Sequence, residues 1–386
     1  MIMADNNENK VLNVPHLRFP EFSGEWKKHS LGEIGETIIG LTYKPSDVVD
    51  NNGIIVFRSS NIKNGMIDYS DLVRVNKHIK DKIITKENDI LVCARNGSQR
   101  LIGKNAIIKQ EDANNTFGAF MMVYRANDNP FILPLLSTKK YFSQVGENLG
   151  ARINQITTSD FNGFEFYFPE NHAERTKIAE LFRLLDERIA TQNKIIEDLK
   201  KLKSAITDLL FHSIADAHTI RLGEIAHITN GAGDVQDANT EHQEDWYPFF
   251  DRSEELKWFP TYSFDKEAVI YAGEGQSFYP RYYNGKFALH QRCYAITDFA
   301  SCIIPKYCYH FMNTLNSYFV RNSVGSTVPS LRMDIFQKVE IRLPPIPKQQ
   351  HICKIIDAFY TKLEVEQRGI SILQELKQFL LSQMFI

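Results

Sequence analysis

The sequence is poor in the residues and motifs that build disulfides, zinc sites or membrane anchors. Its five cysteines form no Cys-x-x-Cys pair, which favours reduced, buried thiols. No apolar run approaches the ~20 residues needed to cross a bilayer, and the first ten residues are polar and rich in asparagine. We therefore expect a short N-terminal tail, no bound metal, no membrane association and a cytoplasmic location.

Complete catalytic motifs are also lacking. Residues 97–105 look like a phosphate-binding loop, but five residues separate the two glycines and Asn105 stands where Ser or Thr would bind magnesium. Residues 255–257 have the Glu-x-Lys form of metal-dependent nucleases, without a Pro-Asp partner on a preceding strand. No S-adenosylmethionine motif is present. We expect no catalytic residue and no cofactor on this chain.

Net charge is small, but its distribution is uneven. The formal charge is −2, which by itself argues against a nucleic-acid binder. Residues 58–104 nevertheless carry ten Lys or Arg against five acids, and residues 276–297 hold three basic residues, one His and no acid among six aromatic rings. Cations beside rings and amides suit contact with phosphates and bases, whereas the same rings could equally fill a core. Acid gathers at residues 234–255 instead.

The strongest feature present is an internal repeat. Leu-Gly-Glu-Ile at residues 31–34 returns at 222–225, and Phe-Glu-Phe-Tyr-Phe-Pro at 164–169 has a strand-like counterpart at 339–344. Between these markers, short β-like runs broken by Gly, Asn and Asp predict two mixed domains. Each copy then passes into a long stretch with helical periodicity. The ends of the copies match and their middles do not.

Both helical stretches follow alternating steps of three and four, which is typical of a coiled-coil seam. The second seam lies 174 residues after the first. The predicted apolar seam positions are Ile178, Leu181, Leu185, Ile195, Leu199, Leu202, Ile206, Leu209, Ile352, Ile355, Phe359, Leu373, Leu376 and Leu380. Apolar residues one position later in the second stretch, such as Ile356, Ile370 and Met384, favour a broader buried stripe there.

These patterns predict an α+β chain in which two mixed α/β domains, related by a pseudo-two-fold, are separated by two long helices packed as an antiparallel coiled coil. A helix that packs only on its own domain is the alternative, although a 38-residue seam of ~57 Å would overrun a small domain. The predicted segments are an N-terminal lead-in at 1–21, a first domain at 22–170, a first helix at 171–213, a second domain at 214–345 and a second helix at 346–386.

The layout resembles the specificity subunit of type I restriction-modification systems, over essentially the whole chain. The resemblance is carried by residues 15–26, the two Leu-Gly-Glu-Ile segments, the run 89–98, and the helix entries at 177–180 and 349–352. It implies two target recognition domains, each of which reads one part of a bipartite, asymmetric DNA site. Residues 174–177, Glu-Arg-Thr-Lys, depart from the usual Glu-Gln-Gln pattern, which leaves open how the first helix meets its partner.

The resemblance also implies partners. These are double-stranded DNA, two methyltransferase subunits docked on the helices, and restriction subunits in the full complex. S-adenosylmethionine, ATP and magnesium would then bind only to partner subunits, and adenine methyltransferase and ATP-dependent endonuclease activities would belong to the assembly. Two other functions stay open at this point, a protein-interaction scaffold with a coiled-coil stalk and an orphan DNA-binding protein.

Within the two domains, base contact is expected from Arg, Asn and Gln side chains, because these make bidentate bonds to guanine and adenine. The candidates in the first domain are Arg58, Ser59, Asn61, Lys63, Arg95, Asn96, Ser98, Gln99, Arg100, Lys104, Arg152 and Asn154. Those in the second domain are Gln276, Arg281, Tyr282, Tyr283, Lys286, His290, Gln291 and Arg292.

Overall fold

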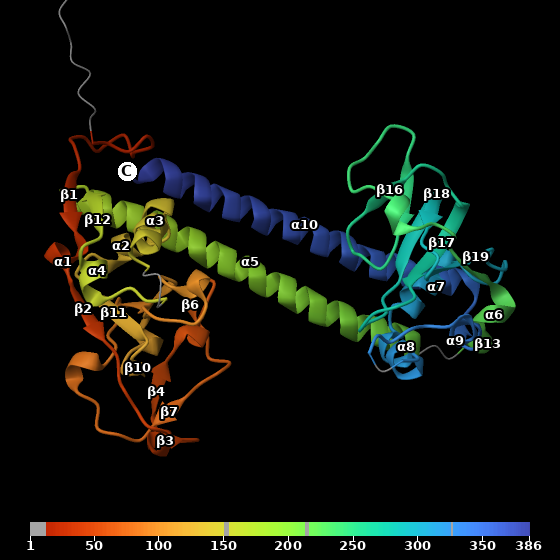
Figure 1. Ribbon diagram of the computed structural model, residues 1–386, viewed down its shortest axis with the longest axis horizontal. Coiled ribbons are helices and arrows are strands. Elements are labelled where there is room, and N and C mark those ends of the chain that lie inside the picture. Colours follow the sequence, from red (N-terminus) through yellow and green to blue (C-terminus); the bar gives the residue numbers. More distant parts are fainter. Residues whose placement is uncertain (1–12, 150–153, 213–215, 326) are drawn as a thin grey trace, which may run out of the picture. The chain divides into compact units, whose positions relative to one another are not determined.

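The computed structural model describes residues 13–149, 154–212, 216–325 and 327–386, which divide into two units (Figure 1). Unit 1 runs to Asn193 and resumes at Gly369, and unit 2 comprises Lys194–Arg368. Helix α5 (His172–His212) begins in unit 1 and ends in unit 2, and helix α10 (Ile346–Met384) does the reverse. The predicted α+β class, with two sheet-rich domains and long helices, is confirmed.

The repeated Leu-Gly-Glu-Ile segment forms the same short helix in both units. In unit 1 it is α1 (Leu31–Ile34), and in unit 2 it is α6 (Leu222–Ile225). The leucine at the start of each is fully buried. A Cβ at Gly32 would lie 3.0 Å from the Cβ of Asn162, closer than ordinary side-chain contacts, and the second copy is equally tight. Close packing of this turn explains why the motif is retained in both halves.

Unit 1 contains two main sheets and two small strand pairs. The first sheet has the order β2-β11-β8-β9, the second β10-β4-β7-β3, and the pairs are β1-β12 and β5-β6. The strands are β1 (Lys27–Ser30), β2 (Glu36–Ile39), β3 (Val48–Val49), β4 (Ile54–Phe57), β5 (Ile62–Lys63), β6 (Met66–Ile67), β7 (Arg74–Val75), β8 (Ile90–Cys93), β9 (Asn105–Ile107), β10 (Thr116–Phe117), β11 (Met121–Arg125) and β12 (Glu165–Phe168).

The main core of unit 1 joins its sheet to short helices and to both long helices. The short helices are α2 (Asn129–Leu135), α3 (Lys139–Asn148) and α4 (Thr158–Asn162). Buried Trp26 makes edge contacts with Phe131 and Phe385, at ring-centroid distances of 6.2 and 6.3 Å. Ile178 of α5 and Leu381 of α10 belong to the same apolar cluster. The core of the first domain therefore includes the N-terminal part of α5 and the C-terminal part of α10.

Unit 2 repeats this plan around one larger sheet with the order β14-β19-β17-β18-β15-β16 and the pair β13-β20. The strands are β13 (His218–Arg221), β14 (His227–Asn230), β15 (Tyr247–Phe250), β16 (Lys257–Phe259), β17 (Phe264–Ala272), β18 (Arg281–Leu289), β19 (Cys293–Thr297) and β20 (Glu340–Leu343). Its short helices are α7 (Pro305–Met312), α8 (Asn316–Asn322) and α9 (Met333–Gln337).

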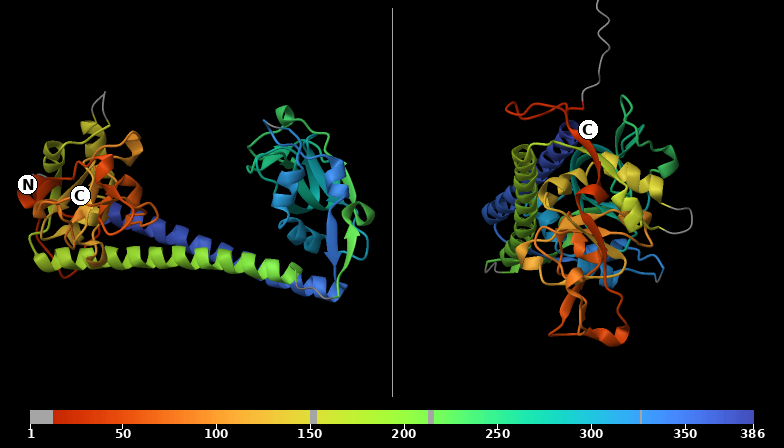
Figure 2. Two further views of the ribbon diagram at one scale, coloured as in Figure 1. Left: turned by 90° about the horizontal axis from the view of Figure 1, so that it is seen from below. Right: turned by 90° about the vertical axis from the view of Figure 1, so that its left-hand side faces the viewer.

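The two helix segments run antiparallel within unit 1 (Figure 2). Phe182 of α5 lies 5.7 Å from Phe385 of α10 between ring centroids, and Asp186, one turn further along α5, pairs with Lys377, two turns earlier on α10. Residues later in α5 therefore contact residues earlier in α10, as in an antiparallel helix pair.

Within unit 2 the direction is the same. Lys203 Nζ lies 4.0 Å from the centroid of the Tyr360 ring, and Phe211, further along α5, shares a core with Ile352, earlier on α10. Each unit therefore contains its own stretch of antiparallel helix pair.

The helix seam follows the predicted period, but half of its positions are shifted by one residue. Ile178, Leu185, Leu199 and Ile206 on α5 are buried or half-buried, as are Ile352, Phe359, Leu373 and Leu380 on α10. The alternate positions are wrong, because Ile195, Leu202, Leu209 and Leu376 are 36%, 49%, 64% and 45% exposed. Predicted Leu181 and Ile355 are half-buried beside fully buried neighbours.

Residues one position later fill the seam instead. On α5 these are Phe182, Ile189, Ile196, Lys203 and Leu210, and on α10 they are Ile356, Leu363, Ile370, Lys377 and Met384. The sequence offers adjacent apolar residues at several of these places, such as Ile195 and Ile196. Periodicity alone does not choose between them, and packing against the domains and the other helix does.

Candidate nucleic-acid interface

Three chain segments cross in unit 1 where β8 ends and β11 begins, in the β2-β11-β8-β9 sheet. The carbonyl of Phe120, just before β11, accepts hydrogen bonds from the backbone N–H groups of Ala94 and Arg95, just after β8, both at 3.0 Å. The carbonyl of Ala94 in turn accepts from the N–H of Ile156 at 2.9 Å. Loops that are normally mobile are thereby fixed on the sheet, which is the arrangement that recognition loops need.

The crossing gathers several of the predicted polar residues. Asn96 Nδ2 donates to Ser59 Oγ at 2.9 Å, and Asn96 Oδ1 accepts from the N–H of Ser98 at 2.9 Å. Asn154 Nδ2 donates to the carbonyl of Gly97 at 3.1 Å. These four predicted residues, Ser98 through its backbone, therefore lie together, on loops from three different parts of the sequence. Arg152 lies outside the described residues.

Cationic side chains flank the crossing. Arg95 is exposed and its guanidinium lies 5.0 Å from the ring centroid of Phe120. Gln99 and Arg100 are exposed on a single 3₁₀ turn, and Lys104 is half-buried. The sequence analysis missed Phe120, whose side chain is 60% exposed. A lone Phe before a strand is typical of a core position, so the sequence carried no signal for it.

Two further predicted cations are already paired. Arg58 binds Asp71 at 2.7 Å and Lys63 binds Asp68 at 3.0 Å. The hydroxyl of Ser70 and the Lys63 ammonium hold the pKa of Asp68 low, at about 2. Because these pairs are largely exposed they contribute little to stability, and a phosphate could replace the carboxylate.

Asn61 has a structural position instead of an exposed one. It is fully buried, its amide donates to the carbonyls of Asp68 and Asp71 at 3.0 and 2.8 Å, and its Oδ1 accepts from the N–H of Arg58 at 2.9 Å. A base contact would require breaking these bonds, so the prediction for Asn61 is corrected. Short polar side chains often satisfy turn backbone in this way.

Unit 2 contains the same crossing. The N–H of Leu331 donates to the carbonyl of Gly273, after β17, at 2.7 Å. A Cβ at Gly273 would lie 2.0 Å from the carbonyl oxygen of Arg292, just before β19, so only glycine allows this approach. Glu274 binds Arg292 at 2.8 Å across the crossing. The predicted residue Gln276 is exposed on the same loop.

Two neighbouring predicted residues belong to this surface. His290 is half-buried, and its Nδ1 accepts from the N–H of Arg292 at 3.2 Å. Gln291 is exposed, and its carbonyl accepts from Asn230 Nδ2 at 3.3 Å. Together with Gln276 and Arg292 they make an amide-rich and cationic surface beside the sheet edge.

The remaining predicted residues of unit 2 spread along β18. Tyr283 packs on Phe250, with ring centroids 5.3 Å apart, whereas Tyr282 donates to Glu267 and faces Tyr309 of α7. The two tyrosines thus lie on opposite faces of the sheet, and burial raises the pKa of Tyr282. Their packing roles correct the prediction that both belong to one reading surface.

The two cations on β18 also differ from each other. Arg281 is half-buried and donates to the carbonyl of Ser253. Lys286 is exposed, with its Nζ 4.7 Å from the centroid of the Tyr262 ring. Of the two, Lys286 is more accessible to a phosphate.

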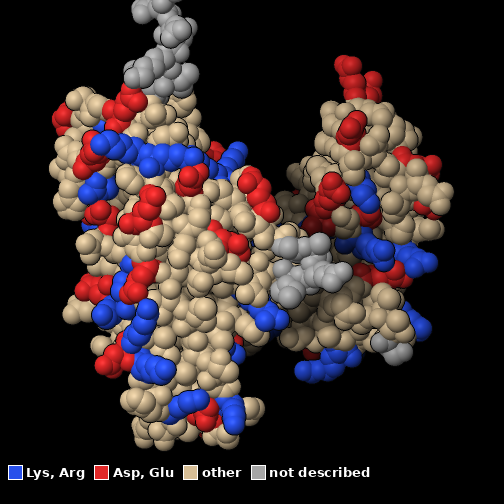
Figure 3. Space-filling view, turned by 60° about the vertical axis from the view of Figure 1, so that its left-hand side comes forward, with Lys and Arg blue, Asp and Glu red and all other residues tan. Residues whose placement is uncertain are grey.

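Charge on the surface is mixed. On the face drawn in Figure 3, Lys and Arg alternate with Asp and Glu and do not merge into one basic surface. Among the described residues no three His, Cys, Asp or Glu side chains are grouped as metal ligands. A search of the same residues finds no helix that is both long and apolar enough to span a bilayer. On this face, any DNA contact would depend on individual side chains more than on a continuous basic surface.

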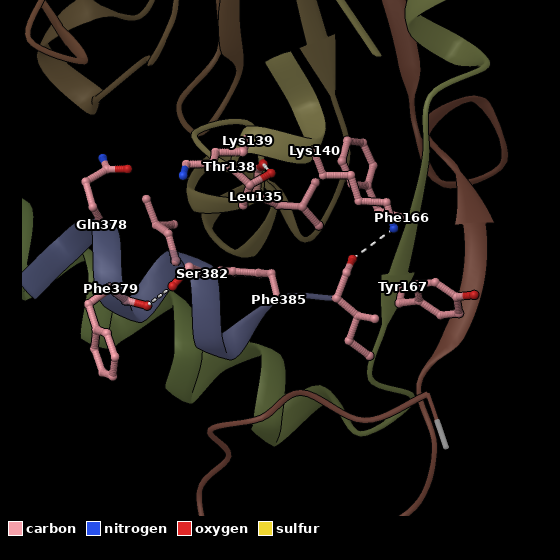
Figure 4. Close-up of a pocket in the computed structure, with 12 residues that line it drawn as sticks. Leu135, Thr138, Lys139, Lys140, Phe166, Tyr167, Gln378, Phe379, Ser382 and Phe385 are labelled. Atoms are coloured by element: carbon pink, nitrogen blue, oxygen red, sulfur yellow. Dashed lines mark hydrogen bonds between the residues drawn. The ribbon is translucent and has the colours of Figure 1, made fainter. Parts of the chain in front are cut away.

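A groove of about 490 Å³ lies in unit 1 beside the end of α10 (Figure 4). Phe166, Phe379, Leu381 and Phe385 supply apolar walls, and Lys139 and Lys140 lie on one side. Lys140 Nζ donates to the carbonyl of Ile386 at 2.9 Å, and burial lowers the pKa of Lys140. Phe379 is 57% exposed, so the groove continues into an uncovered apolar face of α10.

The described residues form two sheet-rich units of repeated plan, each with one segment of α5 and one of α10. The family model that matches the chain is the type I restriction modification DNA specificity domain, over residues 23–201 and 215–378. The chain belongs to this family, which is named for DNA specificity and not for catalysis.

Curated relatives agree with this family. The chain is 31% identical over 165 residues to the specificity subunit of the type I restriction enzyme EcoDI of Escherichia coli, and 28% identical over 193 residues to that of EcoKI from strain K12. These matches cover 42% and 47% of this chain but only 36% and 41% of the relatives.

A solved structure shares the fold over nearly the full chain. The type I restriction-modification S subunit from M. genitalium matches with a TM-score of 0.66 at 18% identity, covering 97% of this chain and 99% of that one. A second structure, described as concerning complex assembly and conformational transition of the type I system, matches at 0.55 and 16% identity over 93% and 97%. At such identities the likeness shows the fold alone.

Proposed function

We propose that this chain is the non-catalytic DNA-recognition subunit of a type I restriction-modification complex. Each sheet-rich domain would read one part of a bipartite, asymmetric site. The observation that carries the proposal is the family match over both halves. A loop crossing in each half supports it, because the hydrogen bond from Ile156 N–H to the Ala94 carbonyl recurs as that from Leu331 N–H to the Gly273 carbonyl. Bacterial DNA lies in the cytoplasm, so we expect the complex to act in that compartment.

The contact residues proposed are those at the two crossings. In the first domain the exposed side chains of Arg95, Gln99 and Arg100 offer guanidinium and amide groups. The amides of Asn96 and Asn154 hold the loops that carry them. Exposed amides and guanidinium groups can form the bidentate bonds that separate adenine from guanine in the major groove. Lys63, Lys104 and Lys286 would neutralise phosphates and set the position of the protein on the duplex.

Methyltransferase subunits are the proposed occupants of the uncovered helix faces. Ile195, Leu202 and Leu209 recur every seven residues on α5 and are exposed, and so are Val365, Ile372 and Phe379 on α10. Apolar side chains at this spacing form a continuous stripe along a helix, and large exposed apolar stripes are typical of protein interfaces. The groove beside Phe379 would extend this surface.

The partner subunits would supply the chemistry. In the proposed assembly two methyltransferase subunits hold S-adenosylmethionine and methylate adenine, and restriction subunits bind ATP and magnesium for cleavage. Salt-dependent, sequence-specific DNA binding by the purified chain with its methyltransferase is the expected result. Methylation should require this chain.

Three outcomes separate the classes of function. Partner capture without any DNA affinity would favour a protein-interaction scaffold. Specific DNA binding without a methyltransferase partner would favour an orphan DNA-binding protein. Site-specific methylation only in the presence of this chain supports the proposal.

The long helices would set the length of the unread gap between the two parts of the site. The 41 residues of α5 span roughly 60 Å, the length of about 17 or 18 base pairs. Inserting seven residues after Lys194 of α5 and after Gln367 of α10 keeps the heptad phase and adds ~10.5 Å. We expect the gap to lengthen by about three base pairs, with unchanged letters in both half-sites.

Sequencing of methylated DNA measures both the gap and the letters. The control inserts the same seven residues in the exposed loop at 240–245 and should leave the gap unchanged. An unchanged gap after the double insertion, or new half-site letters, would contradict the proposed role of the helices.

A further inference from the structure

The two loop crossings match residue by residue, and this identifies equivalent positions in the two domains. Met121 pairs with Cys93 in unit 1, as Cys293 pairs with Ala272 in unit 2. Phe120, just before Met121, is therefore equivalent to Arg292, just before Cys293. Arg95, two residues after Cys93, is likewise equivalent to Glu274, two residues after Ala272.

The partner positions also correspond. Arg95 forms an isolated bridge with Gln155 in unit 1, and Glu274 forms one with Ser330 in unit 2. The pair of Arg95 with Phe120 therefore occupies the same place in the first domain as the pair of Glu274 with Arg292 in the second. One backbone frame carries two different chemistries.

In the first domain this place presents an apolar ring and a cation. The backbone of Phe120 is fixed by two hydrogen bonds to its carbonyl, yet its side chain is 60% exposed. An exposed phenyl ring held at a fixed backbone position offers an apolar surface that an apolar group of a ligand can cover. The guanidinium of Arg95 covers one face of the ring at 5.0 Å.

The covered face decides what kind of DNA contact the ring can make. A side chain that wedges between stacked bases needs both of its faces free, and here one face is taken. The ring edge and the other face remain, and these suit the C5 methyl group of thymine in the major groove. The adjacent guanidinium suits O6 and N7 of a neighbouring guanine.

In the second domain the same place presents an oriented cation. Arg292 is exposed, and the carboxylate of Glu274 holds its Nη1 at 2.8 Å. A guanidinium fixed on one side by a carboxylate presents its remaining N–H groups in a defined direction. This geometry suits a guanine, with Glu274 as a positioning residue that need not touch DNA.

We propose that these two equivalent pairs determine the base read at one step in each half-site. Phe120 contacts a thymine methyl group beside the guanine that Arg95 contacts, and Arg292, held by Glu274, contacts a guanine in the other half-site. This inference rests on the proposed DNA-recognition function. It adds the atoms recognised and gives a physical reason why the half-sites differ.

The test uses the purified chain with its methyltransferase subunits and a duplex that carries the mapped site. Each thymine of the half-site assigned to the first domain is replaced in turn by deoxyuridine, which lacks only the methyl group. We expect one replacement to weaken binding by about three- to five-fold, the effect of one lost methyl contact. Phe120→Ala should weaken binding to the unmodified duplex by at least as much and should no longer respond to that replacement.

Matched variants separate this contact from general effects. Phe142→Ala removes another exposed phenylalanine, on α3, and should keep the full deoxyuridine response.

In the other half-site, 7-deazaguanine removes the N7 acceptor of one guanine at a time. We expect this replacement at one guanine to weaken binding by the unmodified chain. Binding by Arg292→Ala should not change with the replacement at that guanine. Binding by Arg321→Ala, a position exposed on α8, should still be weakened by it. Glu274→Gln should reduce the discrimination at that guanine and leave the deoxyuridine response intact.

The outcomes distinguish this inference from the proposed function. If the unmodified complex binds all duplexes equally, the proposed function itself fails. If binding is sequence-specific but the first half-site lacks a thymine on either strand, or no deoxyuridine replacement changes affinity, the pairing of Phe120 with a methyl group is wrong. The deoxyuridine series on the unmodified chain needs no variant, so a folding defect in Phe120→Ala would not obscure the result.

Discussion

The two junctions between domain and long helix solve one physical problem with different chemistry. At the first junction the carboxylate of Glu174, in the first turn of α5, is almost fully buried. It accepts from Arg18 Nε and Nη2 at 2.7 and 2.8 Å and from Trp26 Nε1 at 3.3 Å. A charged, bidentate pair therefore ties the lead-in segment to the start of the helix.

The second junction uses a neutral amide. Gln349, in the first turn of α10, is fully buried, and its Nε2 donates to the carbonyls of Cys302 and Pro344 at 2.8 and 2.9 Å. Its Oε1 accepts from the N–H of Ile304 at 2.9 Å. All three bonds end on backbone, so this anchor depends on the fold and not on a second side chain.

The residue equivalent to Gln349 in the first copy is Arg175, where the sequence departs from the family pattern. Arg175 pairs with Asp128 at 2.9 Å, and its Nη1 donates to the carbonyl of Pro169 at 2.6 Å. An ion pair thus takes the place of the amide at the same helix position. The departure is therefore accommodated by contacts within the first domain.

The largest expected effect is at the charged junction. Glu174→Ala leaves the guanidinium of Arg18 and the Trp26 indole without their acceptor, and breaking a buried ion pair costs about 3–5 kcal/mol. Urea unfolding followed by circular dichroism should show this loss in the transition of the first domain. Glu187→Ala, which removes an exposed pair with Arg183 on the same helix, should cost less than about 1 kcal/mol. Equal losses for the two variants would show that the junction is not an anchor.

A smaller effect is expected at the neutral junction. Gln349→Ala leaves two carbonyls and one N–H unpaired, and a lost buried hydrogen-bond partner costs about 1–3 kcal/mol. The unfolding transition of the second domain reports this change. Gln350→Ala, at the exposed neighbouring position, is the matched control and should stay within about 0.5 kcal/mol of the unmodified chain. If Gln349→Ala cost more than Glu174→Ala, the ranking of charged above neutral anchors would be reversed.

The helices show what periodicity can and cannot predict. The steps of three and four located both long helices and the seam positions shared by both phases, such as Ile178 and Ile352. The alternate positions needed a choice between neighbours such as Ile195 and Ile196, which are both apolar. Only the three-dimensional contacts with the domains and the second helix make that choice, because burial is a property of the packed structure and not of the period.

Site prediction followed the same division. Residue type singled out Asn96, Ser59 and Asn154, which the structure brings together from loops far apart in sequence, and their contact with DNA stays a prediction. Residue type misplaced Asn61, because an asparagine that satisfies turn backbone and one that faces a ligand look alike in sequence. Phe120 was missed for the opposite reason, since exposure of an aromatic residue next to a strand leaves no local signal.

The smallest expected effect is a pH dependence at the second junction, which contains a buried histidine. His310 of α7 is buried against α10, where its Nε2 lies 3.0 Å from Asp357 Oδ1, and its Nδ1 has no hydrogen-bond partner among the residues that the structure describes. Lys306 of α7 also pairs with Asp357, at 2.8 Å, and Lys203 of α5 lies over the ring of Tyr360, on which His310 stacks. The residue of α5 that corresponds to Asp357 in the repeat is Arg183, and its ion pairs with Glu180 and Glu187 are exposed.

Burial lowers the pKa of His310 in the folded chain, against the attraction of Asp357. The unfolded chain, with a histidine pKa near ~6.5, then binds a proton more readily than the folded one. Stability of the second domain is therefore complete above that value and is lost as pH falls below it toward the folded pKa. Urea midpoints measured from pH 7.5 down to pH 5 should fall less steeply for His310→Gln than for the unmodified chain, whereas His351→Gln, an exposed position on α10, should leave the slope unchanged. If the attraction of Asp357 outweighed burial, the unmodified chain would gain stability relative to His310→Gln on acidification, and this opposite sign would refute the assignment of burial as the dominant cause.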